Sequence, residues 1–188
     1  GTPNTSKCPP KRYLPLRLKE MIILAAAAGK NNELGRESGV PLWNLPDEYA
    51  RFRKSIIGHP IIIGRKSYDV IREPLKGSLN IVITHNKDYN GNGALVVHSL
   101  EEALEKVKAE KIIYIIGGGY IFEMALAIAD RIEISRIDAS FPEATAFFPA
   151  FSTNEWTLLS SSKHDIDSRH KYAFTYEVWE RKNRNLSI

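Results

Sequence analysis

The sequence predicts an α/β domain in which a mainly parallel sheet is flanked by helices and ends in an antiparallel hairpin. Strand-like apolar runs alternate with amphipathic segments from Met21 onward, an order typical of parallel sheets. Residues 21–28 are apolar throughout, as in a strand buried on both faces. Residues 156–163 and 171–181 instead alternate polar and apolar side chains, which indicates a hairpin with one face in water.

Length and composition fit one globular domain. The chain has 188 residues, of which 43% are hydrophobic and 26% charged. No apolar run approaches the roughly 20 residues that span a bilayer, so we expect no membrane partner. Cys8 is the single cysteine and cannot form an internal disulfide, which favours a reducing compartment such as the cytoplasm. The five histidines are scattered along the sequence, and we predict no bound metal.

The formal net charge of +4 comes from the first 20 residues, which hold five basic residues and one acidic residue. Residues 21–188 then contain 21 basic and 21 acidic residues, and this neutral body argues against nucleic-acid binding. Prolines without apolar periodicity predict that residues 1–20 form a flexible basic leader or tag, with a transit peptide as the alternative. We expect the folded domain over residues 21–182 and a tail over 183–188.

The remaining elements follow from local patterns. The polar, glycine-containing stretch 31–41 predicts a long loop, and Pro46 begins a helix predicted over 45–57. Ser99 and Glu102 form a capping box for a helix that runs to residue 107. The predicted strands are 60–64, 80–84, 94–98, 111–116 and 131–137, and the other predicted helices are 65–71 and 120–129.

Glu48 lies near the start of the helix predicted over 45–57. Leu45, Tyr49 and Phe52 recur at helical spacing, so we expect one stripe of this helix to face the interior. Glu48 lies close to the edge of that stripe. A carboxylate there either interacts with the helix dipole or is buried because it meets a ligand.

A triple glycine follows the predicted strand 111–116. Glycines at a strand-to-helix junction let a ligand approach the backbone, and the helix N-terminus offers N–H groups to a phosphate. The alternative for Gly117, Gly118 and Gly119 is a tight turn without a ligand. Their position after a central strand favours ligand contact.

A second junction repeats this arrangement after the predicted strand 60–64. Gly64 is followed by Arg65, Lys66 and Ser67, and cations beside a helix start bind phosphate groups, including the ribose phosphate that distinguishes NADPH from NADH. A solvated basic turn is the alternative. Thr84 and His85, after the next strand, are candidates for further nucleotide contacts.

Ser135 is a hydroxyl within an otherwise apolar strand. It is either bonded to its own backbone or holds a carboxylate through a hydrogen bond. The sequence offers no Ser/His/Asp or Cys/His constellation, which argues against hydrolysis through a covalent nucleophile.

These segments together resemble the dihydrofolate reductase family, over residues 21 to about 181. Seven motifs occur in the family's order and near its spacings. They are the apolar first strand, Leu34-Gly35, Trp43-Asn44-Leu45-Pro46-x-Glu48, Ile63-Gly64-Arg65-Lys66-Ser67, Pro74-Leu75-x-Gly77 with Asn80-Ile81-Val82, Ile116-Gly117-Gly118-Gly119, and Ser135-x-Ile137-Asp138-Ala139.

The resemblance implies an eight-stranded mixed sheet and an NADPH-dependent enzyme that reduces 7,8-dihydrofolate to 5,6,7,8-tetrahydrofolate in one-carbon metabolism. It further implies a monomer and an antifolate target. Glu48 matches the acid that holds the pterin's 2-amino and ring N–H groups and promotes protonation of N5, while hydride passes to C6. Ser135 matches a threonine that orients this acid, and Trp43 completes the implied catalytic set.

The resemblance also implies two sets of binding residues. Those for substrate are Ala25, Ala26, Glu48, Tyr49, Phe52, Ile71, Leu75, Ile116 and Ser135. Those for NADPH are Ala27, Leu34, Gly35, Leu42, Gly64, Arg65, Lys66, Ser67, Thr84, His85, Gly117, Gly118, Gly119, Tyr120, Ile121 and Phe122. The segment 31–42 would close over the nicotinamide, and the peptide between Gly117 and Gly118 would be cis.

Departures from the family pattern leave the substrate open. Ser78 stands where the family usually has an arginine that clamps the folate tail, and loss of such a contact costs about 1.5–3 kcal/mol. Arg53, Arg72 or Lys76 are candidates to replace it. Phe122 replaces a tyrosine, Tyr120 replaces an arginine, and residues 143–149 lack the family's aspartate. The alternatives are a reductase of another pterin or of a flavin-pathway pyrimidine, and a binding protein with little turnover.

Overall fold

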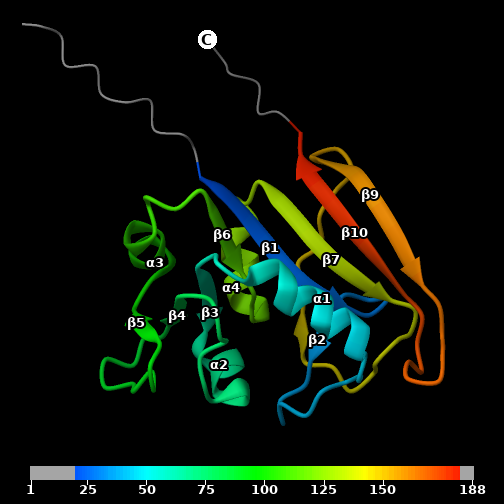
Figure 1. The fold of residues 1–188 in the computed structure, drawn as a ribbon, viewed down its shortest axis with the longest axis horizontal. Helices are drawn as coiled ribbons and strands as arrows, with labels where there is room; N and C mark the ends of the chain where they lie inside the picture. Colours follow the sequence, from blue (N-terminus) through cyan, green and yellow to red (C-terminus); the bar gives the residue numbers. More distant parts are fainter. Residues whose placement is uncertain (1–19, 183–188) are drawn as a thin grey trace, which may run out of the picture.

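The computed structural model describes residues 20–182, so the predicted leader (apart from Glu20) and the predicted tail lie outside the described residues. Its main sheet has eight strands in the order β5-β4-β3-β6-β1-β7-β10-β9 (Figure 1). These strands are β1 Met21–Ala28, β3 Ile61–Gly64, β4 Asn80–Ile83, β5 Leu95–Val97, β6 Ile112–Ile115, β7 Arg131–Ile137, β9 Trp156–His164 and β10 Phe174–Arg181. The six strands from β5 to β7 are parallel, whereas β10 is antiparallel to both of its neighbours, β7 and β9. The predicted fold class is confirmed.

Helices cover both faces of this sheet. Alternate residues of β1 belong to different apolar clusters: Ile22 and Leu24 pack with α3 and α4, while Ile23 and Ala25 pack with α1. The helices are α1 Pro46–Ile56, α2 Arg65–Ile71, α3 Leu100–Lys106 and α4 Gly119–Ala125. Because both faces are buried, the parallel strands read as continuous apolar runs rather than as alternating ones.

The second half of β1 consists of four consecutive alanines, Ala25 to Ala28. This is the carboxyl end of the central strand, where β1 lies between β6 and β7. The ladder with β6 ends at the pair Leu24 and Ile115, whereas the ladder with β7 continues to the pair Ala28 and Arg136. Ala25 and Ile116 are therefore the first residues beyond the point where β1 and β6 separate.

The structure corrects several predicted boundaries. The segment predicted as a loop over 31–41 contains a short strand, β2 Glu33–Gly35, which pairs with β8 Ala146–Phe147 in a separate two-stranded sheet. Neither strand is long enough to show periodicity in the sequence. The predicted helix over 120–129 ends at Ala125, and the predicted strand over 171–181 begins at Phe174. The other predicted elements lie within two residues of the observed ones.

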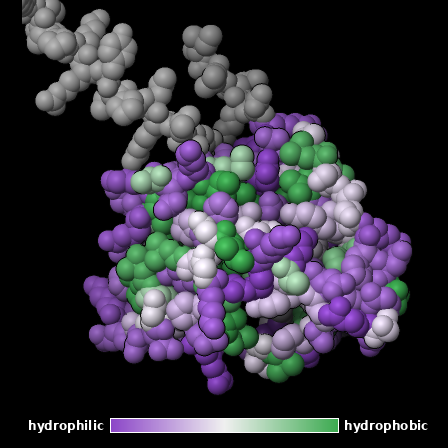
Figure 2. Space-filling model, in the orientation of Figure 1, coloured by the Kyte–Doolittle hydropathy of each residue, from purple (hydrophilic) through white to green (hydrophobic). Residues whose placement is uncertain are grey.

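The face of the molecule that carries α1 shows polar surface interrupted by apolar patches, with a hollow in its lower half (Figure 2). Exposed apolar side chains include Tyr49 on α1, Ile57 directly after it and Val70 on α2. Among the described residues, no helix is long and apolar enough to cross a membrane.

Candidate active site

Helix α1 buries a carboxylate within its inward stripe. Pro46 occupies the first turn, where its missing N–H costs nothing, and Leu45 at the N-cap is buried. The buried residues of the helix are Glu48, with 8% exposure, and Ile56. The prediction that Tyr49 faces the interior is wrong, because 54% of this residue is exposed. Glu48 therefore lies in the stripe itself rather than at its edge.

The carboxylate of Glu48 has two polar neighbours. Arg51, one helical turn later, places Nη2 3.1 Å from Oε1 of Glu48 and 3.4 Å from Oγ of Ser135. The hydroxyl of Ser135, which is fully buried on β7, bonds to the same carboxylate. Burial raises the pKa of Glu48, while Arg51 and Ser135 act in the opposite direction. A desolvated carboxylate with few protein partners is suited to meet a ligand.

Arg51 is a site residue that the sequence analysis did not predict. Its guanidinium carbon lies 3.8 Å from the ring centroid of Tyr176, the β10 residue that pairs with Ser135 on β7. The hydroxyl of Tyr176 bonds to Glu133, a buried β7 carboxylate that also accepts from the hydroxyl of Tyr114 at 3.3 Å. In the sequence, Arg51 lies in the run Arg-Phe-Arg-Lys and resembles an ordinary solvated cation of a helix.

Most of the predicted substrate residues form one apolar surface beside Glu48. Ala25, Phe52, Leu75 and Ile116 belong to a single cluster, and Ile116 also contacts the cluster that includes Ile71. These residues come from β1, α1, the 74–79 turn, the end of β6 and α2. Ala26 does not join them, because its side chain packs against the core on the opposite face of the sheet. The arrangement suits a flat ring held between α1 and α2.

The two predicted glycine junctions meet at the carboxyl edge of the sheet. The N–H of Gly64 donates to the carbonyl of Gly117 at 2.7 Å, and the peptide between Gly117 and Gly118 is cis, as predicted. A side chain at Gly118 would lie 2.8 Å from Oγ of Ser67, and one at Gly64 would lie 2.9 Å from Ile121. A larger residue at either position would need these side chains to move, and Gly117 has a φ of +121°, which favours glycine.

Polar and charged groups surround this glycine edge. Thr84 follows β4, whose Ile83 pairs with Gly64, so Thr84 and the exposed His85 lie at the same edge. Lys66 is exposed, and Arg65 is paired with Asp69 at 2.9 Å. This edge therefore offers glycine backbone, side-chain hydroxyls and two cations. Such groups fit the ribose and phosphate groups of a dinucleotide.

The other predicted cofactor residues lie in three places. Leu42, Trp43 and Ala27 pack in one cluster, where the rings of Trp43 and Phe141 are 5.1 Å apart. Leu34 lies against Gly119, and Gly35 follows on β2. Phe122 is buried beneath Gly117 and packs on Phe148 at 4.9 Å, whereas Tyr120 is exposed.

A second polar cluster lies on the outer side of the first turn of α1. Asp47, His164, Asp167 and His170 place one ligand-type atom each within 4.8 Å of one another. Nε2 of His170 accepts from the backbone N–H of Asp47 at 3.0 Å, and its Nδ1 donates to Asp167 at 2.8 Å. His164 contacts Asp47 at 2.9 Å and the carbonyl of Asp165 at 2.8 Å.

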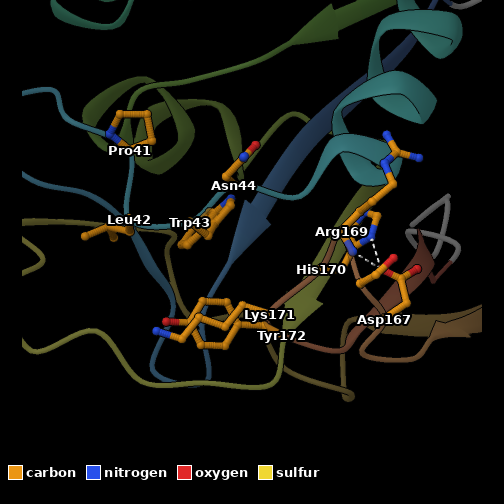
Figure 3. Close-up of a pocket in the computed structure, with 10 residues that line it drawn as sticks. Pro41, Leu42, Trp43, Asn44, Asp167, Arg169, His170, Lys171 and Tyr172 are labelled. Carbon is orange, nitrogen blue, oxygen red and sulfur yellow. Dashed lines mark hydrogen bonds and ion pairs between the residues drawn. The ribbon is translucent and has the colours of Figure 1, made fainter.

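Because every ring nitrogen in this cluster has a hydrogen-bond partner, the cluster is explained as a connection between the β9–β10 segment and α1. The groove in Figure 3 lies beside it, between residues 41–44 and 167–172, with Trp43 on one side and His170 on the other. The absence of a metal remains a prediction.

The turn that would meet a folate tail is ordered by its own hydrogen bonds. Oγ of Ser78 donates to the carbonyl of Ile56 at 2.7 Å and is turned towards the end of α1. Asn80 binds the backbone of Leu75 and Ser78. Of the three candidate replacements, Lys76 lies within this turn and Arg53 contacts it, because Nη2 of Arg53 donates to the carbonyl of Lys76 at 3.3 Å.

A mainly parallel sheet has glycine junctions and cations at its carboxyl edge and a buried carboxylate over the same edge, and this is the architecture of an α/β enzyme that binds a nucleotide. The family described as dihydrofolate reductase matches residues 21–181. The chain belongs to the dihydrofolate reductase family.

Individual relatives agree with this assignment. The dihydrofolate reductase of Bacillus subtilis is 33% identical over 163 residues, which are 87% of this chain and 96% of the relative. That of Mycobacterium tuberculosis is 36% identical over 163 residues, covering 80% and 98%. The solved structure of dihydrofolate reductase from Enterococcus faecalis complexed with NADP(H) and RAB-propyl superimposes with a TM-score of 0.81 at 28% identity, covering 87% of this chain and 97% of that one.

Proposed function

We propose that this protein reduces 7,8-dihydrofolate to 5,6,7,8-tetrahydrofolate with NADPH, and that Glu48 is the acidic residue that binds the pterin ring. The observation that carries the proposal is the placement of Glu48. A carboxylate within the buried stripe of α1 lies beside an apolar surface that includes Phe52, Leu75 and Ile116, and Ser135 is bonded to it.

Glu48 as an anion suits two parallel N–H donors, such as the amino and ring N–H groups of a dihydropterin. Ser135 orients the carboxylate, and the carbonyls of Ala25 and Ile116 lie where β1 and β6 separate, within reach of the amino group of a ring seated there. The site promotes transfer of a proton to N5 through water. Positioning of the ring and exclusion of water then supply most of the rate enhancement.

The nucleotide would lie along the glycine edge formed by Gly64, Gly117 and Gly118. NADPH, when bound, supplies the hydride that is transferred to C6. Lys66 and Arg65 would hold its phosphates, Thr84 and His85 would add polar contacts, and Trp43 with the 31–42 segment would shield the nicotinamide end.

One observation favours a second candidate function, namely reduction of a pterin without a glutamate tail. Ser78 bonds to Ile56 instead of presenting a cation, so the clamp expected for folate is absent at that position. Arg53 is positioned to replace it in part. We further propose that the enzyme is a cytoplasmic monomer, which light scattering during size-exclusion chromatography would test.

The first experiment measures NADPH oxidation by the purified protein with 7,8-dihydrofolate and with a dihydropterin that lacks the glutamate tail. We expect a clear preference for dihydrofolate, expressed as kcat/KM. Equal use of both substrates would transfer the assignment to a tail-independent pterin reductase. Ligand-induced thermal stabilisation without oxidation of either substrate would contradict the enzyme assignment and indicate a binding protein.

A further inference from the structure

A guanidinium lies directly against the buried acid of this site, between α1 and the sheet. We propose that Arg51 is a positioning residue that holds Glu48 as a carboxylate and so sets the pH range over which the enzyme works. The inference rests on the proposed role of Glu48, and its test is chosen so that the two ideas fail in different ways.

The position of Arg51 is determined on three sides. Its Nη2 donates to Glu48 at 3.1 Å and to Ser135 at 3.4 Å, and the guanidinium lies over the ring of Tyr176. The side chain is 28% exposed and that of Glu48 is 10% exposed, so water screens the pair only partly. A planar guanidinium suits stacking on an aromatic ring together with a hydrogen bond in its own plane.

Stability alone does not account for this arginine. Its Nε is buried and has no hydrogen-bond partner among the described residues. A buried unpaired N–H is unfavourable, and a largely buried ion pair is weak evidence of net stabilisation because desolvation offsets the attraction. Among the described residues, Arg53 and Arg131 also have a buried guanidinium nitrogen without a partner, and Arg51 differs from them in its contact with Glu48.

Arg51 leaves Glu48 able to bind a ring. An ionised carboxylate has about four acceptor positions on its two oxygens. Arg51 uses one position on Oε1, and Ser135 donates to the same group, so acceptor positions remain for two further N–H donors. The ion pair therefore does not have to break when a ligand binds, and the positive charge stays beside the acid throughout the reaction.

The other ionisable groups around the pair do not replace Arg51. On β7, Glu133 accepts hydrogen bonds from Tyr114 of β6 and Tyr176 of β10, and burial together with Glu133 raises the pKa of Tyr176 to about 12, so both tyrosines remain neutral. Arg131 acts on these tyrosines. On the outer side of α1, Nε2 of His170 accepts from the backbone N–H of Asp47, and Nδ1 of His170 donates to Asp167. Arg51 is the cation that lowers the pKa of Glu48 against the effect of burial.

The test is the pH dependence of hydride transfer, measured in single turnovers with NADPH and 7,8-dihydrofolate. An arginine beside a carboxyl lowers its pKa by about 1–3 units. In Arg51→Met, which keeps length but removes the charge, the ionisation assigned to Glu48 should move to higher pH by about one unit or more. In Arg51→Lys, which keeps the positive charge, this ionisation should return most of the way to its wild-type pH. Lys54→Met is the matched control, because Lys54 is an exposed cation on the same helix that the site does not use.

An unshifted profile in Arg51→Met, or an equal shift in Lys54→Met, would overturn the inference while leaving the proposed function intact. If Arg51→Lys does not restore the wild-type pH profile, the inference is also overturned, because the shift in Arg51→Met would then come from lost packing and not from lost charge. Should Arg51→Met not fold, Arg51→Gln keeps a donor for Oε1 without the charge and should show the same upward shift. Failure of the proposed function looks different: the wild type would not oxidise NADPH, or Glu48→Gln would keep the wild-type profile.

Discussion

Two adjacent carboxylates on the first turn of α1 have opposite environments. Asp47 is on the outer side, where 44% of its side chain is exposed, and it is bonded to His164 and Arg169. The bond with His164 lowers the pKa of Asp47. Glu48 faces the sheet, where burial raises its pKa and Arg51 and Ser135 only partly compensate. Asp47 thus has its hydrogen-bond partners within the protein, whereas Glu48, the next residue, has acceptor positions left without one among the described residues.

The comparison shows that a carboxylate is suited to bind a ligand when the fold removes it from water without supplying all of its hydrogen-bond partners. Asp47 has partners enough to remain a structural anion. Glu48 has lost its water without gaining a full set of partners, which is the environment expected of a group that meets a ligand. Position on the helix decides this, because consecutive residues lie about 100° apart around the axis.

Replacement of the two acids by their amides gives the largest expected contrast. Glu48→Gln should lose roughly 10²- to 10⁴-fold in the rate of dihydrofolate reduction, least at low pH where solvent protonates N5, with NADPH affinity kept. Asp47→Asn is the matched control on the same turn and should change the rate by no more than about twofold. Stopped-flow turnover and NADPH fluorescence titration measure both. Equal losses in the two variants would remove the distinction between the acids.

His170 tests whether the outer cluster is structural. It is fully buried, and its Nε2 accepts the N–H of Asp47 at the start of α1. His170→Ala removes this cap and leaves a cavity, so we expect a loss of about 2–3 kcal/mol in the free energy of unfolding. His164→Ala, at the exposed partner, should lose less. Denaturant titration measures the losses, and single-turnover rates in the folded variants should stay near wild type.

Opposite pH dependences of stability are the subtlest expected difference. The pKa of Asp47 is lowered from 3.8 and that of His164 is raised from 6.5, so their bond stabilises the fold between these values. That contribution is lost as pH falls through the folded pKa of Asp47 or rises through that of His164. The pKa of Glu48 is raised from 4.5, so its ionisation on going above that pH reduces stability.

Unfolding free energies of the wild type and the two amide variants, measured from pH 4.5 upward, separate these effects. The deficit of Asp47→Asn relative to wild type should be greatest near pH 5.5 and shrink as His164 loses its proton. Glu48→Gln should gain on the wild type as pH rises. Parallel curves for all three proteins would contradict the contrast between the acids.

Much of the fold was predictable because its strands are buried on both faces and therefore read as apolar runs. The same reasoning located the glycine edge, since Gly64 and Gly117 each follow such a run. The spacing to Leu45 and Phe52 placed Glu48 near the edge of the inward stripe and left its role open, and the same spacing wrongly placed Tyr49 in the interior.

The features that escaped prediction depend on contacts between distant residues. His170 lies 123 positions from Asp47, and no spacing rule connects them. Arg51 becomes part of the site because Tyr176 of β10 lies next to Ser135 of β7, which requires the strand register. The strands β2 and β8 comprise three and two residues and owe their pairing to the surrounding chain.

The four alanines of β1 restrict how this protein can change. Ala25 faces the α1 side, where Glu48 and the apolar surface lie, and Ala26 faces the α3 and α4 core. A larger side chain at 25 would occupy the space left for a ring, while one at 26 or 28 would force apart an already packed interior. Alanines of identical size and polarity are thus limited by two different volumes, the space beside Glu48 at Ala25 and the packed interior at Ala26 and Ala28.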